Sequence, residues 1–419
     1  MPHSPLLLQL VLILGTARLL SLLLRRLGQP PVIGEMTAGI VLGPIVLGAL
    51  LPQWHAQVFE PSSLPALEGL SQVGLVLFMF IVGAELRAPH GARRQLVAAG
   101  WISLMSVLVP MACGVGAAWL LYAEFAPAGV AFPTFALFMA SAMSITAFPI
   151  MARILKERGM THSLIGRLSL TSAAMADVIA WIMLALVVVL ADSREDWSRF
   201  WRMLAGLALL AALLLTAGRP LLARLIERFA SDRRPEGPML AILLIGTFAC
   251  AYATKSLGVH PVFGAFLFGA ALPRDDRLLE ALIERVEHIA IIVLMPVFFA
   301  LAGLNTTPSA FVGTGLAALL IVLFAAVAGK VLGGAAGARI AGYPWRTALA
   351  VGSLMNARAL MELIVMKVGL DAGVIGNDLF TMLMVMAIAT TFMTGPLLTL
   401  FAGSGEGQDR DATDTTARP

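Results

Sequence analysis

Long apolar runs, separated by short charged stretches or by Pro and Gly, form the dominant pattern along the chain. These runs predict thirteen helical segments, near 5–25, 31–50, 66–87, 95–123, 132–157, 163–191, 198–217, 237–256, 259–272, 281–304, 308–340, 345–369 and 374–402. Most reach the roughly 20 residues that a helix needs to cross about 30 Å of hydrocarbon. We therefore expect an all-α polytopic membrane protein with about thirteen transmembrane helices, formed by a membrane domain over residues 1–402.

The basic residues indicate how the segments are oriented. If the N-terminus lies outside, nineteen Lys and Arg residues fall at the connections and span ends that face the cytoplasm, and five fall on the other side. Short cytoplasmic loops carry such an excess of positive charge. The pattern predicts a multi-pass protein of the cell (inner) membrane with its C-terminus in the cytoplasm. The polar residues 403–419 are expected to form a disordered cytoplasmic tail.

Composition agrees with a membrane protein and removes several other classes. Hydrophobic residues make up 59% of the chain and charged residues 13%, with a mean hydropathy of +0.89, whereas a soluble domain carries about 25% charged residues. The net charge of +4 is assigned to the cytoplasmic loops, so no nucleic-acid partner is expected. Cys113 and Cys250 lie in separate apolar runs and predict neither a disulfide nor a metal site.

Two pairs of segments resemble each other at the same spacing. GEMTAGIVLGP (34–44) resembles VFGAFLFGAALP (262–273), and LFMFIVGAEL (77–86) resembles PVFFALAGLN (296–305). Both pairs are seven segments apart, and an odd offset inverts the second copy in the membrane. We predict two inverted six-helix repeats, at about 5–191 and 237–402, joined by a linker helix at about 198–217. Inverted repeats with broken helices recur in secondary transporters.

Corresponding segments of the two repeats are expected to be interrupted. In the run 141–149, Pro149 removes a backbone donor and disfavours the helix before it, and nearby hydroxyls can satisfy the freed backbone or bind an ion. The matching run 352–362 contains Asn356, Arg358 and Glu362. Two interrupted helices crossing at mid-membrane would bring helix ends together at one point.

Charged residues inside the apolar runs are the candidates for function, because an ionisable group at mid-membrane costs several kcal/mol. Asp177 lies at the centre of the sixth segment with no other charge within about two turns, which suits alternate binding of a proton and a metal cation. A structural salt bridge is the alternative. Lys330, in the eleventh segment, is the natural charge partner of Asp177, although it could instead extend to the inner interface.

The remaining intramembrane charges have two readings each. Arg358 and Glu362 are four residues apart and share a helix face if that region is helical. They are either a self-contained pair that stabilises the broken helix, or part of a gate or a second ion-facing group. Glu35 and Glu85, near the cytoplasmic ends of their segments, could attract cations to an inner funnel or be ordinary interfacial carboxylates.

These residues occur in stretches that resemble the monovalent cation:proton antiporter superfamily, in the branch of Kef-type bacterial transporters and plant CHX-type exchangers. The stretches are GEMTAGIVLGP (34–44), LVLFMFIVGAELR (75–87), SAMSITAFPIMARILKERG (141–159), SAAMADVIAWIMLAL (172–186), VHPVFGAFLFGAALPR (259–274), LMPVFFALAGLNT (294–306) and NARALMELIVMKVG (356–369). The resemblance implies a homodimer, with a mobile core that exposes its site to each side by an elevator-like motion.

The same resemblance assigns site residues. It implies that Asp177 binds the ion, that Ser144 and Thr146 line the crossing, and that Lys330 is a lysine found in many members. Ser172 is a further candidate for lining the ion site. The chain departs from the family at Ala176, where many relatives carry Asn, Gln or Asp. One carboxylate then suggests one cation for one proton, that is, electroneutral exchange.

The sequence therefore predicts antiport of Na⁺ or K⁺ against protons, with no cofactor. Gated potassium efflux, with a separate regulatory subunit, and sodium-coupled uptake of an organic acid are the alternatives. An enzyme is not expected, because the chain contains no HExxH, GxSxG or P-loop motif.

Overall fold

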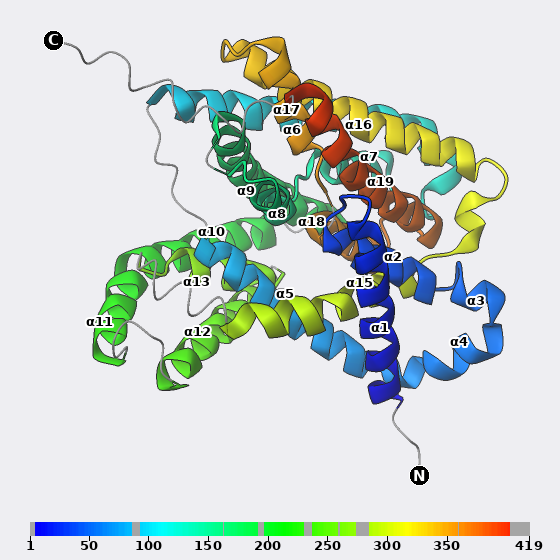
Figure 1. The fold of residues 1–419 in the computed structure, drawn as a ribbon, viewed down its shortest axis with the longest axis horizontal. Coiled ribbons are helices and arrows are strands. Elements are labelled where there is room, and N and C mark those ends of the chain that lie inside the picture. Colours follow the sequence, from blue (N-terminus) through cyan, green and yellow to red (C-terminus); the bar gives the residue numbers. More distant parts are fainter. Residues whose placement is uncertain are drawn as a thin grey trace. The chain divides into compact units, whose positions relative to one another are not determined.

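The structure is a computed structural model that describes residues 5–85, 93–161, 163–191, 197–229, 237–258, 260–273, 285–358 and 360–402. Its described residues form helices and connections without any strand (Figure 1). The first half contains α1 (Leu6–Arg25), α2 (Pro31–Leu42), α3 (Leu47–Leu50), α4 (Pro52–Val58), α5 (Leu64–Glu85), α6 (Arg93–Phe125), α7 (Phe132–Ser144), α8 (Phe148–Glu157) and α9 (Leu164–Ala191). The second half contains α10 (Trp197–Leu213), α11 (Arg219–Phe229), α12 (Gly237–Ser256), α13 (Val262–Ala270), α15 (Met295–Leu304), α16 (Gly315–Ile340), α17 (Trp345–Met355), α18 (Leu360–Asp371) and α19 (Asn377–Ala402). The all-α prediction is confirmed.

Each of the thirteen predicted segments contains a helix. Within the described residues, nine helical stretches are long and apolar enough to cross a membrane by length and composition. The number of thirteen spans stays a prediction, because some of the remaining helices are short. The predicted connection after 198–217 is partly helical, since α10 continues through a π turn at Leu214–Gly218 into α11.

Both predicted interruptions are present. The segment 132–157 divides into α7 and α8, and Ile145, the residue that follows α7, is extended with φ −69° and ψ 140°. Pro149 is the second residue of α8, where its missing N–H has no helical role. The segment 345–369 divides into α17 and α18 around residues 356–358.

The chain forms two compact units, and each unit combines parts of both predicted repeats. Unit one comprises residues 1–20, 35–88 and 194–304, and unit two comprises 21–34, 89–193 and 305–419, in both cases with the undescribed residues set aside. The repeat boundaries themselves stay a prediction.

In unit one, the four helices singled out by the internal repeat pack as reciprocal pairs. α2 lies against α15 so closely that a Cβ at Gly43 would collide with the carbonyl of Gly303. α5 lies against α13 in the same way, and a Cβ at Gly83 would collide with the carbonyl of Phe266. α2 of the first repeat thus packs on α15 of the second, and α13 of the second packs on α5 of the first, which is the arrangement that a two-fold relationship between the repeats produces.

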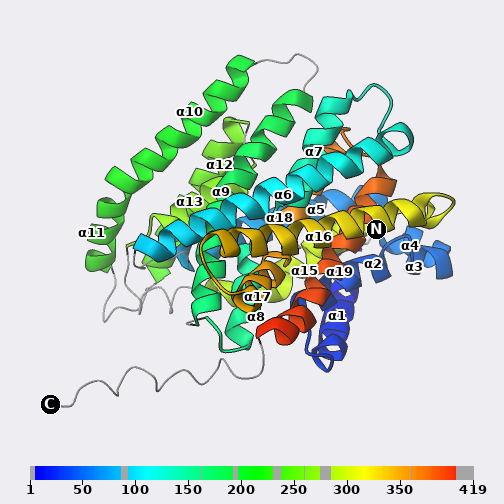
Figure 2. The same ribbon diagram turned by 90° about the horizontal axis from the view of Figure 1, so that it is seen from above.

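In unit two, α6 and α16 form an antiparallel pair that flanks the interrupted helices (Figure 2). Gly329, Gly333 and Gly337 of α16 contact residues 110, 105 and 102 of α6 in turn, so the residue numbers rise on one helix as they fall on the other. Small residues on one face let two helix backbones approach. This helix pair supports the charged residues of unit two, which lie on or next to it.

Candidate ion site

The two interruptions meet in unit two. The backbone N–H of Ala147, between α7 and α8, donates to the carbonyl of Ala357, between α17 and α18, at 3.0 Å. Helix α9, which carries Asp177, packs against all four of these half-helices. The crossing predicted from the sequence therefore exists, and the aspartate lies on the helix that supports it.

Lys330 is completely buried in α16 and caps the end of α7. Its Nζ donates to the carbonyl of Ser144, to the Thr146 hydroxyl at 2.7 Å and to the carbonyl of Ser106 at 3.0 Å. A lysine ammonium has three donors, so all three are used. The alternative reading, in which Lys330 extends to the inner interface, does not agree with this complete burial.

The Ser106 carbonyl is available to Lys330 for a reason that the sequence contains. Pro110 lies inside α6 and has no N–H to donate to the residue four positions before it, which is Ser106. The freed carbonyl would be unsatisfied in the interior of the protein. Lys330 supplies the missing donor.

Arg358 caps the same end of α7 from the opposite interruption. Its Nη1 donates to the carbonyl of Ala142 at 3.1 Å, and its Nη2 donates to the carbonyls of Met143 at 2.8 Å and Ala326 at 3.3 Å. The last carbonyls of a helix lack helical partners and carry partial negative charge. Arg358 and Lys330 together satisfy three consecutive carbonyls, at residues 142–144, with positively charged donors.

The ion pair expected from the spacing of Arg358 and Glu362 is present. Nη1 lies 3.1 Å from Oε1, and both side chains are 0% exposed. Oε2 of Glu362 has no hydrogen-bond partner among the described residues. Because Arg358 also binds α7, the pair is more than a local contact within α18: it joins the two interrupted helices.

Asp177 lies in α9 with 6% of its surface exposed, and its Oδ1 has no hydrogen-bond partner in the described part of the chain. The charge of Lys330 acts on this carboxylate, but no ion pair joins the two side chains, both of which are described. The closed Asp177–Lys330 pair expected from the sequence is therefore not formed here. The physical reason is that the oxygens of α6, Ser144 and Thr146 already occupy the three donors of Lys330.

Buried hydroxyls lie at the crossing and on α9, the helix that packs against it. Ser144 Oγ donates to the carbonyl of Ser141 at 2.9 Å, and Ser172 Oγ donates to that of Leu168 at 2.7 Å. Both are buried, as is Thr146. Since each serine O–H donates within its own helix, the oxygen lone pairs are left to accept a hydrogen bond or to bind a cation.

Helix α19 contributes residues that the sequence analysis did not name. The Thr391 hydroxyl accepts from the N–H of Arg358 at 3.1 Å and donates to its carbonyl at 3.0 Å. Nδ2 of Asn356 donates to the carbonyl of Thr390 at 3.1 Å. The adjacent threonines in an otherwise apolar run were the available signal, because α18 cannot supply these partners itself.

Three predicted residues are not brought to the crossing by any described contact. Glu35 is half-buried in α2 and belongs to unit one. The side chains of Glu85 and Pro149, like residues 403–419, lie outside the described part of the chain. The inner funnel stays a prediction.

Comparison with known proteins places this geometry in a family. Residues 11–402 match the family described as "Sodium/hydrogen exchanger, transmembrane". The chain belongs to the sodium/hydrogen exchanger family. That match spans both interruptions, Asp177 and Lys330, so the family resemblance drawn from the sequence motifs is confirmed.

Individual relatives of this family agree. The chain is 37% identical over 391 residues to the Na⁺/H⁺ antiporter NhaS4 of Synechocystis, covering 93% of this chain and 95% of that protein. It is 36% identical to the Cation/H⁺ antiporter 17 of Arabidopsis thaliana and 32% identical to the K⁺/H⁺ antiporter 1 of Saccharomyces cerevisiae, covering 94% and 95% of this chain. The chain spans only about half the length of these two relatives, 48% and 46%.

A solved structure shares the fold of the family. The sodium proton antiporter MjNhaP1 of Methanocaldococcus jannaschii matches with a TM-score of 0.67, covering 94% of this chain and 99% of that one. At 14% identity this likeness bears on the fold alone. It confirms the predicted sodium/proton antiporter fold.

Proposed function

We propose that this chain exchanges a monovalent cation, Na⁺ or K⁺, for protons across the bilayer, with Asp177 as the group that carries either one. Membership of the sodium/hydrogen exchanger family supports a transporter rather than an enzyme, and its relatives are named as Na⁺/H⁺ and K⁺/H⁺ antiporters. The observation that carries the proposal is the buried carboxylate of Asp177, which has a free oxygen and no ion pair among the described residues, on the helix that packs against both interruptions.

The chemistry follows from the cost of a buried charge. An unpaired carboxylate in a poorly solvated interior is unfavourable, so Asp177 is expected to hold either a proton or a cation. Ser144, Thr146, Ser172 and backbone oxygens freed by the interruptions supply further cation ligands. Organic acid uptake would need a larger solute at this site, and nothing at the crossing favours it over a bare cation.

In this proposal, Lys330 couples the binding of the cation to the release of the proton from Asp177. In the structure its ammonium group occupies the Ser144 carbonyl and the Thr146 hydroxyl, which are oxygens that a cation would also use. A cation that binds Asp177 must displace Lys330 from these oxygens, and Lys330 returns when a proton replaces the cation. This exchange replaces the making and breaking of a direct Asp177–Lys330 pair.

The proposal also includes an elevator-like motion, a homodimer and an orientation in the cell membrane. Asp177, Lys330, Arg358 and Glu362 all lie in unit two, so unit two is the part that would move as an elevator to expose the site to each side in turn. A homodimer in the cell membrane, with the N-terminus outside, completes the proposal.

Asp177→Asn tests the proposal in proteoliposomes that report internal pH by fluorescence. We expect cation-driven proton flux to be lost while the detergent-purified protein keeps its elution profile, since Asn has the shape of Asp but holds neither ion. Asp371→Asn is the matched control, because Asp371 forms an exposed pair with Lys367 on α18 and should exchange normally. Unchanged flux in Asp177→Asn would refute the role of Asp177.

A further inference from the structure

A cavity lies where the first turn of α6 meets the last turn of α16, at the end of this helix pair away from the α6–α7 connection. Its volume is about 440 Å³, and its lining residues are Arg93, Arg94, Val97, Ala98, Trp101, Ile340 and Ala341. Known pockets for small molecules measure roughly 300–1,000 Å³. All the lining residues belong to unit two, so the cavity is built by one compact unit, and none of them takes part in the ion site.

The lining changes character in an ordered way along α6. Arg93, Val97 and Trp101 are spaced by four residues and share one helix face, so a cationic residue is followed by an aliphatic one and then by an indole. Over these eight residues α6 rises about 12 Å. Trp101 is 40% exposed, and Ile340 on α16 is 55% exposed, so the apolar part of the cavity opens to the surface of the protein.

The cationic end of the cavity has no anionic partner in the described part of the chain. Arg93 and Arg94 are exposed, and neither has an ion pair or hydrogen bond among the described residues. No acidic residue is among the described residues that line the cavity. A neighbouring arginine differs, since Arg339 donates to the carbonyl of Tyr343 at 2.6 Å and lies over the Trp345 ring at 5.1 Å.

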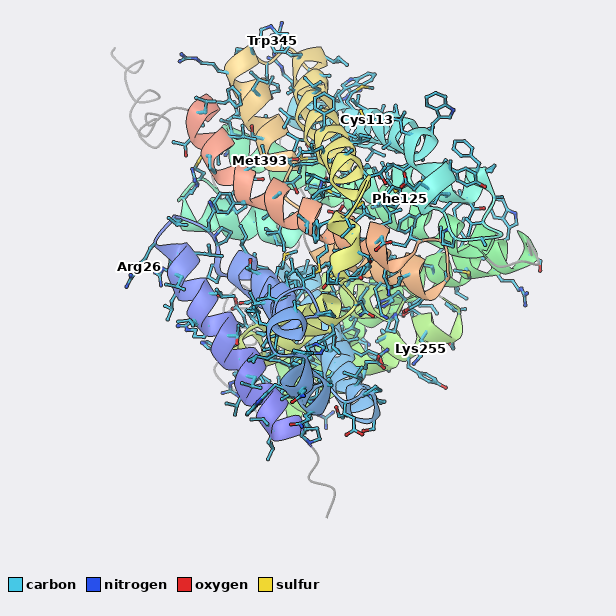
Figure 3. All side chains as sticks on the ribbon, turned by 90° about the vertical axis from the view of Figure 1, so that its right-hand side faces the viewer. Arg26, Cys113, Phe125, Lys255, Trp345 and Met393 are labelled. Atoms are coloured by element: carbon cyan, nitrogen blue, oxygen red, sulfur yellow. The ribbon has the colours of Figure 1, made fainter. Side chains whose placement is uncertain are left out.

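The residues around the cavity are typical of a membrane–water interface. Trp345, labelled in Figure 3, begins α17 and is 62% exposed beside Arg339, and exposed tryptophans with arginines collect at that level of a bilayer. The excess of positive charge predicts this end to be cytoplasmic, and the cytoplasmic leaflet attracts basic protein surfaces through its anionic lipids.

We propose that this cavity is a binding site for an anionic phospholipid, whose phosphate is held by Arg93 and Arg94 and whose acyl chain follows Val97, Trp101 and Ile340. Charge complementarity and the transition from polar to apolar lining both require a ligand with an anionic head and an apolar tail. The lipid would tie the end of α6 to the end of α16, the two helices that provide Ser106 and Lys330 to the ion site. It would thus stabilise the frame of unit two.

The test uses the full chain purified in detergent, with phosphatidylglycerol, phosphatidylcholine and inorganic phosphate as separate probes. Phosphatidylglycerol is expected to raise the thermal unfolding midpoint, and brominated phosphatidylglycerol is expected to quench Trp101, read as the difference between wild type and Trp101→Phe. Arg93→Gln/Arg94→Gln should weaken the apparent lipid affinity about 30-fold, because each surface arginine accounts for about 1 kcal/mol toward anionic lipid.

Arg25→Gln/Arg26→Gln is the matched control, since it removes the same charge from two adjacent exposed arginines that do not line the cavity. It should leave lipid affinity and Trp101 quenching unchanged. Equal stabilisation by phosphatidylcholine or by phosphate alone, equal loss in the control, or absence of Trp101 quenching would each overturn the proposal. Because the readout is binding, the result is independent of whether the chain exchanges cations for protons.

Discussion

At the scale of single residues, Lys330 has the most informative environment. A buried ammonium is tolerated only when its charge and its donors are satisfied, and three oxygens from α6 and the α7 interruption satisfy the donors of Lys330. Asp177, whose carboxylate experiences the charge of Lys330, keeps one oxygen free. Lys330 therefore occupies oxygens that a cation could bind, while the carboxylate of Asp177 stays without a hydrogen bond at one of its oxygens.

This arrangement makes a prediction about Lys330→Gln. The amide can still donate hydrogen bonds, but it lacks the charge that strengthens them and that repels an incoming cation. We expect the cation concentration for half-maximal exchange, measured at alkaline pH where protons compete least, to fall about tenfold, the equivalent of one charge-assisted hydrogen bond. Lys367→Gln, at an exposed pair on α18, is the control. A half-maximal concentration that stays the same or rises would contradict competition between Lys330 and the cation.

At the scale of helices, the buried Arg358–Glu362 pair holds the crossing together. Arg358 donates to carbonyls of α7 and α16 as well as to Glu362. Arg358→Met would leave those carbonyls and a buried carboxylate without a cationic partner. Breaking such a pair typically costs about 3–5 kcal/mol, and we expect a corresponding fall in the unfolding midpoint of the purified protein.

Two further variants make that prediction specific. Arg358→Met/Glu362→Met should recover part of the lost stability, because it removes the stranded carboxylate. Lys367→Met breaks a pair of the same spacing on the same helix whose side chains are 41% and 59% exposed, and it should cost less than about 1 kcal/mol. If Arg358→Met lowered the unfolding midpoint as little as Lys367→Met does, the contacts of Arg358 between the interrupted helices would not contribute to stability.

The reciprocal helix pairs of unit one can be tested through their glycines. Gly303→Ala puts a methyl group against the Gly39 carbonyl of α2, and Gly269→Ala puts one against the Phe80 carbonyl of α5. Each substitution is expected to lower the unfolding midpoint, and by similar amounts if the pairs are repeat equivalents. Gly116→Ala in α6 meets nothing within 4 Å and should be neutral or stabilising, since Ala favours helix by about 1 kcal/mol over Gly. If neither Gly303→Ala nor Gly269→Ala changed the unfolding midpoint, the two helix pairs of unit one would not be closely packed at these glycines.

The sequence predicted elements better than it predicted contacts. The helices, both interruptions and the Arg358–Glu362 pair follow from apolar runs, from Pro149 and from a spacing of four, all of which are visible as residue letters. The partners of Lys330 are mostly backbone carbonyls. Every residue has a backbone carbonyl, so the identity of a residue in the sequence does not show which carbonyl Lys330 will contact. Pro110 was the exception, because it releases the Ser106 carbonyl four positions earlier.

At the scale of the whole molecule, the charge carried in each half of the cycle decides whether the membrane potential drives transport. Asp177 is buried beside Ala176, which is 1% exposed and cannot ionise. Glu362, the other carboxylate that is buried among the described residues, is bound to Arg358. One carboxylate then returns with one proton or one cation, and these two loaded forms carry the same charge.

Electroneutral exchange has a thermodynamic signature that can be measured in proteoliposomes. If one cation exchanges for one proton, flux stops when the two concentration gradients are equal, whatever the membrane potential. If two protons moved per cation, a potential of 100 mV would contribute about 2.3 kcal/mol and shift the balance point about 50-fold. We therefore expect the balance point to be the same with the potential clamped at zero or at about 100 mV. A shift of that size would mean that a second group, with Glu362 as the first candidate, releases a proton in each cycle.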